Sequence, residues 1–266
     1  MPRRGVVRRE RRGVALALCV GLLWPPLMVL TRRRWQGVEH VPIAGGFVFA
    51  ANHISYADPF LFAHFVHDSG YAPHFLAKRS LLRLPVVGRL LIATGQIPVN
   101  RETDVAAQAY RDAVVAVRRG RSVIVYPEGT LTRDPGLWPM VGRTGAARIA
   151  MDSGCPVIPC AQWGAQELLP PYARWPRLLA RPVNQVLVGP PVDLDELRGQ
   201  EITAELLREA TARIMSAITA LLAQLRQQNA PPVRFDPRRE GVPTTGNPGR
   251  PGRGRRRGAD QQGDRP

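Results

Sequence analysis

Five short apolar runs in the middle of the chain constrain its fold more than any other feature. Each is five or six residues long, and its apolar residues are mostly consecutive rather than alternating with polar ones. Strands that are buried on both faces show this pattern, and they occur in parallel sheets whose two faces are covered by helices. The runs are residues 46–51, 95–99, 121–126, 156–160 and 184–189.

Segments with helical patterns separate or follow these runs. In residues 103–119, for example, Val114 and Val117 fall on roughly one side of a helix, and Gly120 follows as a stop signal. Alternation of strands and helices predicts an α/β fold with a mixed, mostly parallel central sheet flanked by helices. The predicted helices are residues 59–68, 103–119, 143–153 and 203–227.

The first 34 residues contain nine arginines and one glutamate, which bracket an uncharged apolar segment at residues 13–30. This segment is short for a membrane span, which needs about 20 residues. Pro25 and Pro26 should also interrupt the helix after residue 24. We therefore expect a membrane-anchoring helical segment that lies in the membrane surface, with its arginines facing anionic lipid. A buried core helix and a single tilted span are the alternatives.

The rest of the chain divides into a domain at residues 35–228 and a tail at residues 229–266. The domain has nearly balanced charge, although the whole chain carries a net charge of +16. The tail is rich in Arg, Pro and Gly and poor in large apolar residues, so we predict that it is disordered. A solvated basic tail is the simplest interpretation, and we do not expect nucleic acid as a partner.

Polar residues with chemical potential follow the first predicted strand. His53 stands where open α/β sheets bind ligands, at the carboxyl end of a strand. Asp58 precedes a proline, which is typical of a helix N-cap. One of its oxygens can cap the helix while the other orients His53 as a general base. Ser55 is an alternative nucleophile, although it lacks the glycine-flanked turn of serine hydrolases.

Two further polar clusters follow other predicted strands. Glu128, Gly129 and Thr130 come directly after the strand at 121–126, and Gly129 permits close approach of the backbone to a ligand. Arg101 follows the strand at 95–99 and has the fork geometry that binds phosphate. Each cluster alone also fits an ordinary turn or a solvated charge. Three clusters at strand ends in one chain favour a common site.

Metal binding is not expected from the cysteines. The chain has Cys19, Cys155 and Cys160. Their spacing does not match the recognisable ligand pairs of a zinc site. We therefore predict that the site contains no metal.

The three clusters resemble the signature of the lysophosphatidate acyltransferases (1-acylglycerol-3-phosphate acyltransferases), within the glycerolipid acyltransferase superfamily. That signature is Asn-His-four-Asp, then Gly-x-Ile-x-x-x-Arg, then Phe-Pro-Glu-Gly-Thr-Arg, then an apolar segment around a proline. The chain shows the same order over about residues 35–190 and looks most similar to actinobacterial members. The matching segments are Asn52-His53 with Asp58, Gly95-Gln96-Ile97 with Arg101, Tyr126-Pro127-Glu128-Gly129-Thr130 and Val157-Ile158-Pro159.

Two positions depart from this signature. Tyr126 replaces the phenylalanine, and Leu131 stands where many members have arginine. The second change removes one phosphate contact that the resemblance would imply. Residues that can compensate for it are Arg101, Arg133 and Arg143.

The resemblance implies an O-acyltransferase that moves a fatty acyl chain to the sn-2 hydroxyl of 1-acylglycerol 3-phosphate, giving phosphatidate for phospholipid synthesis. The acyl donor would be acyl-CoA or acyl carrier protein, and no cofactor or metal is implied. His53 would be the general base and Asp58 its orienting partner, while backbone amides near Gly129 are candidates to stabilise the oxyanion. The implied substrate-binding residues are Asn52, Arg101, Glu128, Gly129, Thr130 and Arg143.

The expected location is the cytoplasmic face of the cell membrane, as a peripheral or monotopic protein. Two alternatives stay open. One is an acyltransferase that acts on glycerol 3-phosphate, another lysolipid or a glycolipid. The other is a membrane-surface binding module without catalytic activity.

Overall fold

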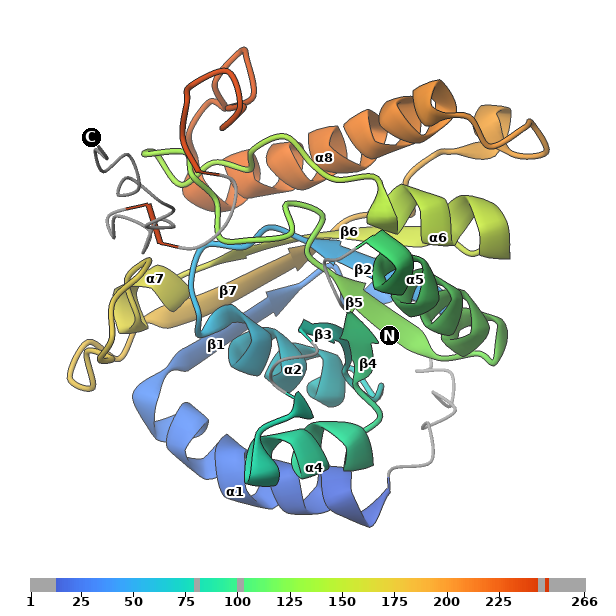
Figure 1. The fold of residues 1–266 in the computed structure, drawn as a ribbon. Coiled ribbons are helices and arrows are strands. Elements are labelled where there is room, and N and C mark those ends of the chain that lie inside the picture. Colours follow the sequence, from blue (N-terminus) through green and yellow to red (C-terminus); the bar gives the residue numbers. More distant parts are fainter. Residues whose placement is uncertain (1–12, 79–81, 100–102, 244–246, 249–266) are drawn as a thin grey trace, which may run out of the picture.

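A seven-stranded sheet runs through the centre of the computed structural model, which describes residues 13–78, 82–99, 103–243 and 247–248 (Figure 1). The strands are β1 (Arg32–Gln36), β2 (Phe47–Ala51), β3 (His74–Lys78), β4 (Ile97–Val99), β5 (Ser122–Val125), β6 (Val157–Trp163) and β7 (Val183–Val188). Their order in the sheet is β1-β7-β6-β2-β5-β3-β4. Every neighbouring pair is parallel except β6 and β7, so the predicted mixed, mostly parallel sheet is confirmed.

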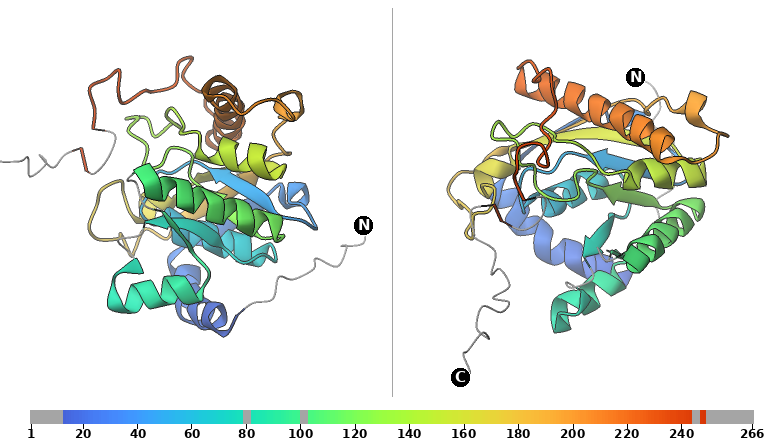
Figure 2. Two further views of the ribbon diagram at one scale, coloured as in Figure 1. Left: turned by 45° about the vertical axis from the view of Figure 1, so that its right-hand side comes forward. Right: turned by 45° about the horizontal axis from the view of Figure 1, so that its top comes forward.

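Helices cover both faces of this sheet, as the views in Figure 2 show. They are α1 (Val14–Leu30), α2 (Asp58–Asp68), α4 (Pro85–Ala93), α5 (Thr103–Arg118), α6 (Gly145–Ser153), α7 (Ala165–Leu168) and α8 (Ala204–Arg226). Apolar side chains of α5, α6 and α8 pack on one face, against residues such as Val48 and Val123. The other face packs against α2 through an aromatic cluster that includes Phe49, Phe62 and Phe65.

The five predicted strands correspond to β2, β4, β5, β6 and β7, and the four predicted helices correspond to α2, α5, α6 and α8. Two strands were not predicted. β1 consists mainly of exposed arginines, because it is an edge strand that pairs only with β7. β3 is short, and the polar residues His74 and Lys78 stand at its two ends. Neither strand therefore consists of an apolar run of five or six residues. The boundary predicted between residues 34 and 35 falls within β1.

The prediction that Pro25 and Pro26 interrupt the first helix is wrong. Both prolines lie inside α1, which continues to Leu30. Leu27 and Leu30 pack against the apolar cluster that α2 and α7 form. This burial offsets the backbone hydrogen bonds that the prolines remove.

The rest of α1 is only partly covered by the domain. The Trp24 ring lies against the rings of His64 and His67 on α2, with centroid distances of 5.0 and 5.1 Å. In contrast, the apolar side chains of Leu18 and Leu22 are 68% and 74% exposed. None of the helices in the described ranges has both the length and the apolar character that crossing a membrane requires.

The ordered domain extends past residue 228, where the sequence suggested a boundary. The backbone N–H of Val141 donates to the carbonyl of Phe235 at 2.9 Å. The Arg234 guanidinium donates to the hydroxyl of Ser216 on α8. Residues 229–243 are thus attached to the domain, while residues 244–246 and 249–266 of the predicted tail lie outside the described residues.

The close approach of α5 to β2 depends on Gly46. A Cβ atom at this position would lie 1.9 Å from the backbone oxygen of Val117 at the end of α5. We expect Gly46→Ala to lower the free energy of unfolding by about 2–4 kcal/mol, because either the helix or the strand must shift. Urea unfolding of the wild type and the variant measures this difference.

Gly145→Ala is the matched control, because a Cβ atom at Gly145 would meet no atom within 4 Å. Its stability should stay within about 0.5 kcal/mol of the wild type. Equal stability of both variants would contradict this account of the β2–α5 contact.

Candidate active site

The predicted contact between His53 and Asp58 is present. His53 lies two residues beyond the end of β2, and Asp58 is the first residue of α2. His53 Nδ1 donates to Asp58 Oδ2 at 2.9 Å. An imidazole that donates from Nδ1 carries its lone pair on Nε2, which can then accept a proton.

Asp58 does not cap α2, contrary to the prediction. Its Oδ2 atom accepts hydrogen bonds from the backbone N–H groups of Ile54 (2.6 Å) and Ser55 (2.8 Å), which precede the helix. The same oxygen accepts the bond from His53, and the whole side chain is buried. The carboxylate therefore organises the loop before α2, rather than the first turn of the helix itself.

Ser55 is not arranged as a nucleophile. Its hydroxyl donates to the carbonyl of Leu169 at 2.6 Å and accepts from the N–H of Ala57 at 3.0 Å. The side chain is buried. His53 makes its hydrogen bond to Asp58 instead, so this geometry disfavours a serine hydrolase.

Glu128 connects the His53 loop to the segment that follows the Pro-Glu-Gly turn. Its Oε1 atom accepts from the backbone N–H of His53 at 2.9 Å, and its Oε2 atom accepts from that of Met140 at 3.1 Å. Burial raises the pKa of Glu128 to about 8, although these N–H donors oppose the shift. Glu128 therefore supports the position of the His53 backbone, and its direct contact with a substrate stays a prediction.

Asn52 forms a second support, with Gln162 on β6. Its side-chain amide donates to the Gln162 carbonyl (3.1 Å) and accepts from the Gln162 N–H (2.8 Å). The Gln162 side chain returns a bond to the Asn52 carbonyl at 2.6 Å. These three bonds extend the pairing of β2 with β6 up to the residue before His53. The role of Asn52 in binding substrate stays a prediction.

The Pro-Glu-Gly turn lies beside the His53 loop, because the backbone N–H of Thr132 donates to the His53 carbonyl at 2.7 Å. Gly129 in this turn has φ of 70°, which favours glycine. A Cβ atom there would lie 2.9 Å from Nε of Arg143, so the exposed Arg143 side chain covers the turn. Thr130 follows Gly129 and is half-buried. The structure thus places Gly129, Thr130 and Arg143 together beside the His53 loop. The predicted Arg101 lies outside the described residues.

Leu131, which replaces the arginine of the signature, is fully buried. The nearby Arg133 is also buried, and its guanidinium donates to the hydroxyl of Tyr172. The same guanidinium lies 5.1 Å from the centre of the Tyr172 ring. Burial raises the pKa of Tyr172, although the Arg133 charge opposes this shift.

The sequence interpretation missed the role of Tyr126, which it treated as a mild replacement of phenylalanine. The Tyr126 ring stacks on the His53 imidazole, with 4.2 Å between centroids and 14° between the ring planes. The aromatic residue directly before the Pro-Glu-Gly turn could have indicated this contact with His53. It follows β5, and His53 follows β2, which is the neighbouring strand in the sheet.

An apolar groove of about 210 Å³ opens between α1 and the start of α2. Its walls come from Leu23 and Leu27 of α1, from Tyr56 and Phe60 at the start of α2, and from Leu169. Tyr56 lies between Ser55 and Ala57 in the loop that Asp58 organises. The polar site and the apolar groove are therefore joined through one loop.

Known proteins share this domain. The profile of the Acyltransferase family matches residues 32–163. The 1-acyl-sn-glycerol-3-phosphate acyltransferase of Borreliella burgdorferi is 36% identical over 124 residues, which are 46% of this chain and 48% of that protein. The protein of the same name from Salmonella typhimurium is 28% identical over 191 residues, covering 70% of this chain and 72% of its own. The predicted closeness to actinobacterial members stays a prediction.

The fold also has a solved counterpart. The crystal structure of the 1-acyl-sn-glycerophosphate acyltransferase PlsC from Thermotoga maritima matches with a TM-score of 0.60 and 21% identity, over 81% of this chain and 82% of that one.

The chain aligns with 48% of the Borreliella burgdorferi relative and 38% of one from Brassica napus, less than two thirds of either length. Through its residues 32–163, the chain belongs to the acyltransferase family.

Proposed function

We propose that the protein transfers a fatty acyl chain from acyl-CoA or acyl carrier protein to the sn-2 hydroxyl of 1-acylglycerol 3-phosphate, giving phosphatidate. The observation that carries this proposal is the hydrogen bond from His53 to the buried Asp58, within a domain of the acyltransferase family. The relatives named 1-acyl-sn-glycerol-3-phosphate acyltransferase support the choice of acceptor.

In the proposed reaction, His53 Nε2 takes the proton of the acceptor hydroxyl while that oxygen attacks the thioester carbonyl carbon. The carbon–sulfur bond then breaks, and the imidazolium returns the proton to the departing thiolate. Asp58 stabilises the imidazolium that forms between these steps. A general base of this kind contributes about 10²–10⁴-fold to the rate. The proposal includes no covalent intermediate, cofactor or metal.

The oxyanion of the tetrahedral intermediate needs hydrogen-bond donors. The backbone N–H of Gly129 was a candidate, but it donates to the carbonyl of Tyr126 at 2.9 Å. This hydrogen bond stabilises the turn. Gly129 instead contributes its small size, which gives the Arg143 side chain room over the turn.

We further propose that Arg143 binds the phosphate of the acceptor. Its side chain is exposed to solvent and covers the turn beside His53. Arg133 is enclosed against Tyr172, which makes it less accessible to an incoming substrate. The predicted phosphate contact of Arg101 is retained as part of this proposal.

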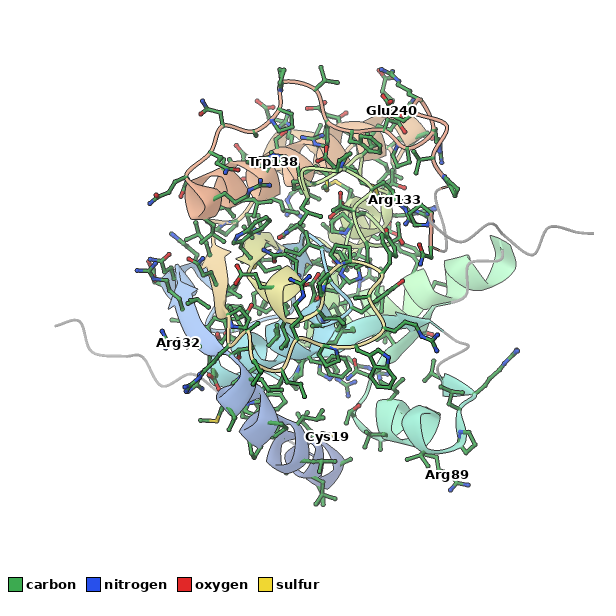
Figure 3. The ribbon with its side chains drawn as sticks, turned by 90° about the vertical axis from the view of Figure 1, so that its left-hand side faces the viewer. Cys19, Arg32, Arg89, Arg133, Trp138 and Glu240 are labelled. Carbon is green, nitrogen blue, oxygen red and sulfur yellow. The ribbon has the colours of Figure 1, made fainter. Side chains whose placement is uncertain are left out.

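The surface around α1 and α4 suits a membrane. Side chains of both helices are exposed and apolar, including Leu18, Leu22, Val86 and Ile92. Arginines of β1 follow α1 directly, and Figure 3 shows Cys19 of α1 and Arg89 of α4 at the same end of the molecule. We propose that this end rests on anionic lipid at the cytoplasmic face of the cell membrane, where the apolar groove receives an acyl chain.

The first test measures CoA released from acyl-CoA with a thiol reagent. Release should require lysophosphatidate, and phosphatidate should appear in mass spectra. His53→Ala should lower the rate at least about 100-fold, because it removes the base. His40→Ala, in a short helical turn at Val38–His40, serves as the control and should keep its activity.

Glycerol 3-phosphate and lysophosphatidylcholine serve as competing acceptors in the same assay. A preference for either would assign a different acceptor, and undiminished turnover in His53→Ala would refute the proposed base.

The second test concerns Arg143→Ala. We expect the apparent KM for lysophosphatidate to rise about tenfold or more, because a charge-assisted hydrogen bond to the phosphate is lost. The KM for acyl-CoA should change much less. Arg148→Ala is the control, because Arg148 is also exposed but lies over the Tyr110 ring. Equal rises of both KM values would exclude a specific role for Arg143 in acceptor binding.

The third test is flotation of the protein with vesicles that contain anionic lipid. Replacing Leu18 and Leu22 together by serine should reduce the bound fraction several-fold, because apolar surface that inserts among the lipids is removed. Val233→Ser removes a side chain of similar exposure (74%) from the segment beyond α8. It should leave binding unchanged. Loss of binding in the control, or full binding of the double variant, would place the lipid contact elsewhere.

A further inference from the structure

Tyr126 belongs to a stack of three rings that crosses neighbouring strands. Its ring lies 4.2 Å from the His53 imidazole on one side and 6.2 Å from the Phe75 ring on the other. The three residues lie on or just beyond β2, β5 and β3, which are adjacent in the sheet and parallel. Tyr126 therefore follows a strand, β5, that lies between β2 and β3, rather than belonging to a surface loop.

The sheet explains why these rings face each other. Phe75 is paired with Ile124, and Tyr126 follows two residues later, so its side chain continues on the Ile124 side of the sheet. Neighbouring strands lie about 4.8 Å apart, close to the spacing of stacked rings. Strand geometry thus brings the Tyr126 ring onto the imidazole.

The hydrogen bond to Asp58 does not by itself define how the imidazole is oriented. It holds Nδ1 at 2.9 Å from the carboxylate, but the ring can still turn about that contact. The torsion that sets the plane of a histidine ring has a broad minimum. A face-to-face contact at an angle of 14° removes this freedom and so directs Nε2.

We propose that Tyr126 is a positioning residue for His53, whose ring face holds the plane of the imidazole and supports the imidazolium that forms during acyl transfer. This inference rests on the proposed function, in which the acceptor hydroxyl proton moves to Nε2. A cation over the face of a phenol ring is attracted by the ring electrons. Burial raises the pKa of Tyr126 well above its ordinary value, and the Asp58 charge adds to this shift, so the ring stays neutral.

The stack can be tested without any substrate. In NMR spectra, the His53 Cε1–H resonance should be shifted upfield in the wild type and in Tyr126→Phe, because both keep an aromatic face over the imidazole. Tyr126→Leu should lose this shift, and His53→Gln identifies the resonance. An identical resonance position in all three proteins would overturn the stack.

Kinetics then test its role. Tyr126→Leu should lower kcat about tenfold, while the KM values for lysophosphatidate and acyl-CoA stay within about twofold. Tyr126→Phe should keep kcat within about twofold, because the ring face is retained. Unchanged kcat in Tyr126→Leu, or an equal loss in Tyr126→Phe, would overturn the assignment.

Tyr71→Leu provides the matched control. It removes an aromatic ring that packs on Phe47 instead of His53, so it should lower the unfolding temperature and leave kcat unchanged. If Tyr126→Leu fails to fold, Tyr126→Met replaces it, because methionine fills a similar space without a flat face. An inactive wild type would refute the proposed function, whereas an active wild type with a fully active Tyr126→Leu would refute only the positioning role.

Discussion

The buried carboxylate of Asp58 is the interaction on which the site depends. A buried charge costs several kcal/mol unless hydrogen-bond donors surround it. Here one oxygen accepts the backbone N–H groups of Ile54 and Ser55 and the ring N–H of His53, so the position of the imidazole depends on the fold of this loop. Glu128 holds the backbone of the same loop from the side of β5. Two acidic side chains therefore position His53. Asp58 holds its imidazole ring, and Glu128 holds its backbone N–H.

Strand positions in this chain could be predicted where burial alone determines the residue type. The runs at 121–126 and 156–160 lie in the middle of the sheet, where both faces must be apolar. β1 could not be found in this way, because an edge strand exposes its arginines to solvent. The continuation of α1 through Pro25 depends on packing against α2 and α7, which is a contact between distant segments. No local pattern contains that information.

The residue types of the site could be predicted, but the direction of each side chain could not. The spacing from His53 to Asp58 indicated a pair, and the proline after Asp58 suggested a helix cap as well. Only the folded loop shows that the pair is present and the cap is not. The residue type of Glu128 did not indicate that both of its oxygens accept backbone N–H groups, and its contact with a substrate stays a prediction. An acidic residue in a strand-end turn fits either arrangement, because the polar groups that surround it come from other parts of the chain.

The contacts that hold His53 come from the centre of the sheet. They are the buried carboxylate of Asp58, a backbone contact to Glu128 and the face of Tyr126. The apolar groove and the exposed side of α1 lie away from these contacts, where the proposed lipid substrate would bind. A lipid substrate has many rotatable bonds and contributes little order of its own. In the proposed reaction, the ordering that acyl transfer needs would come from the protein, and three separate contacts hold one histidine.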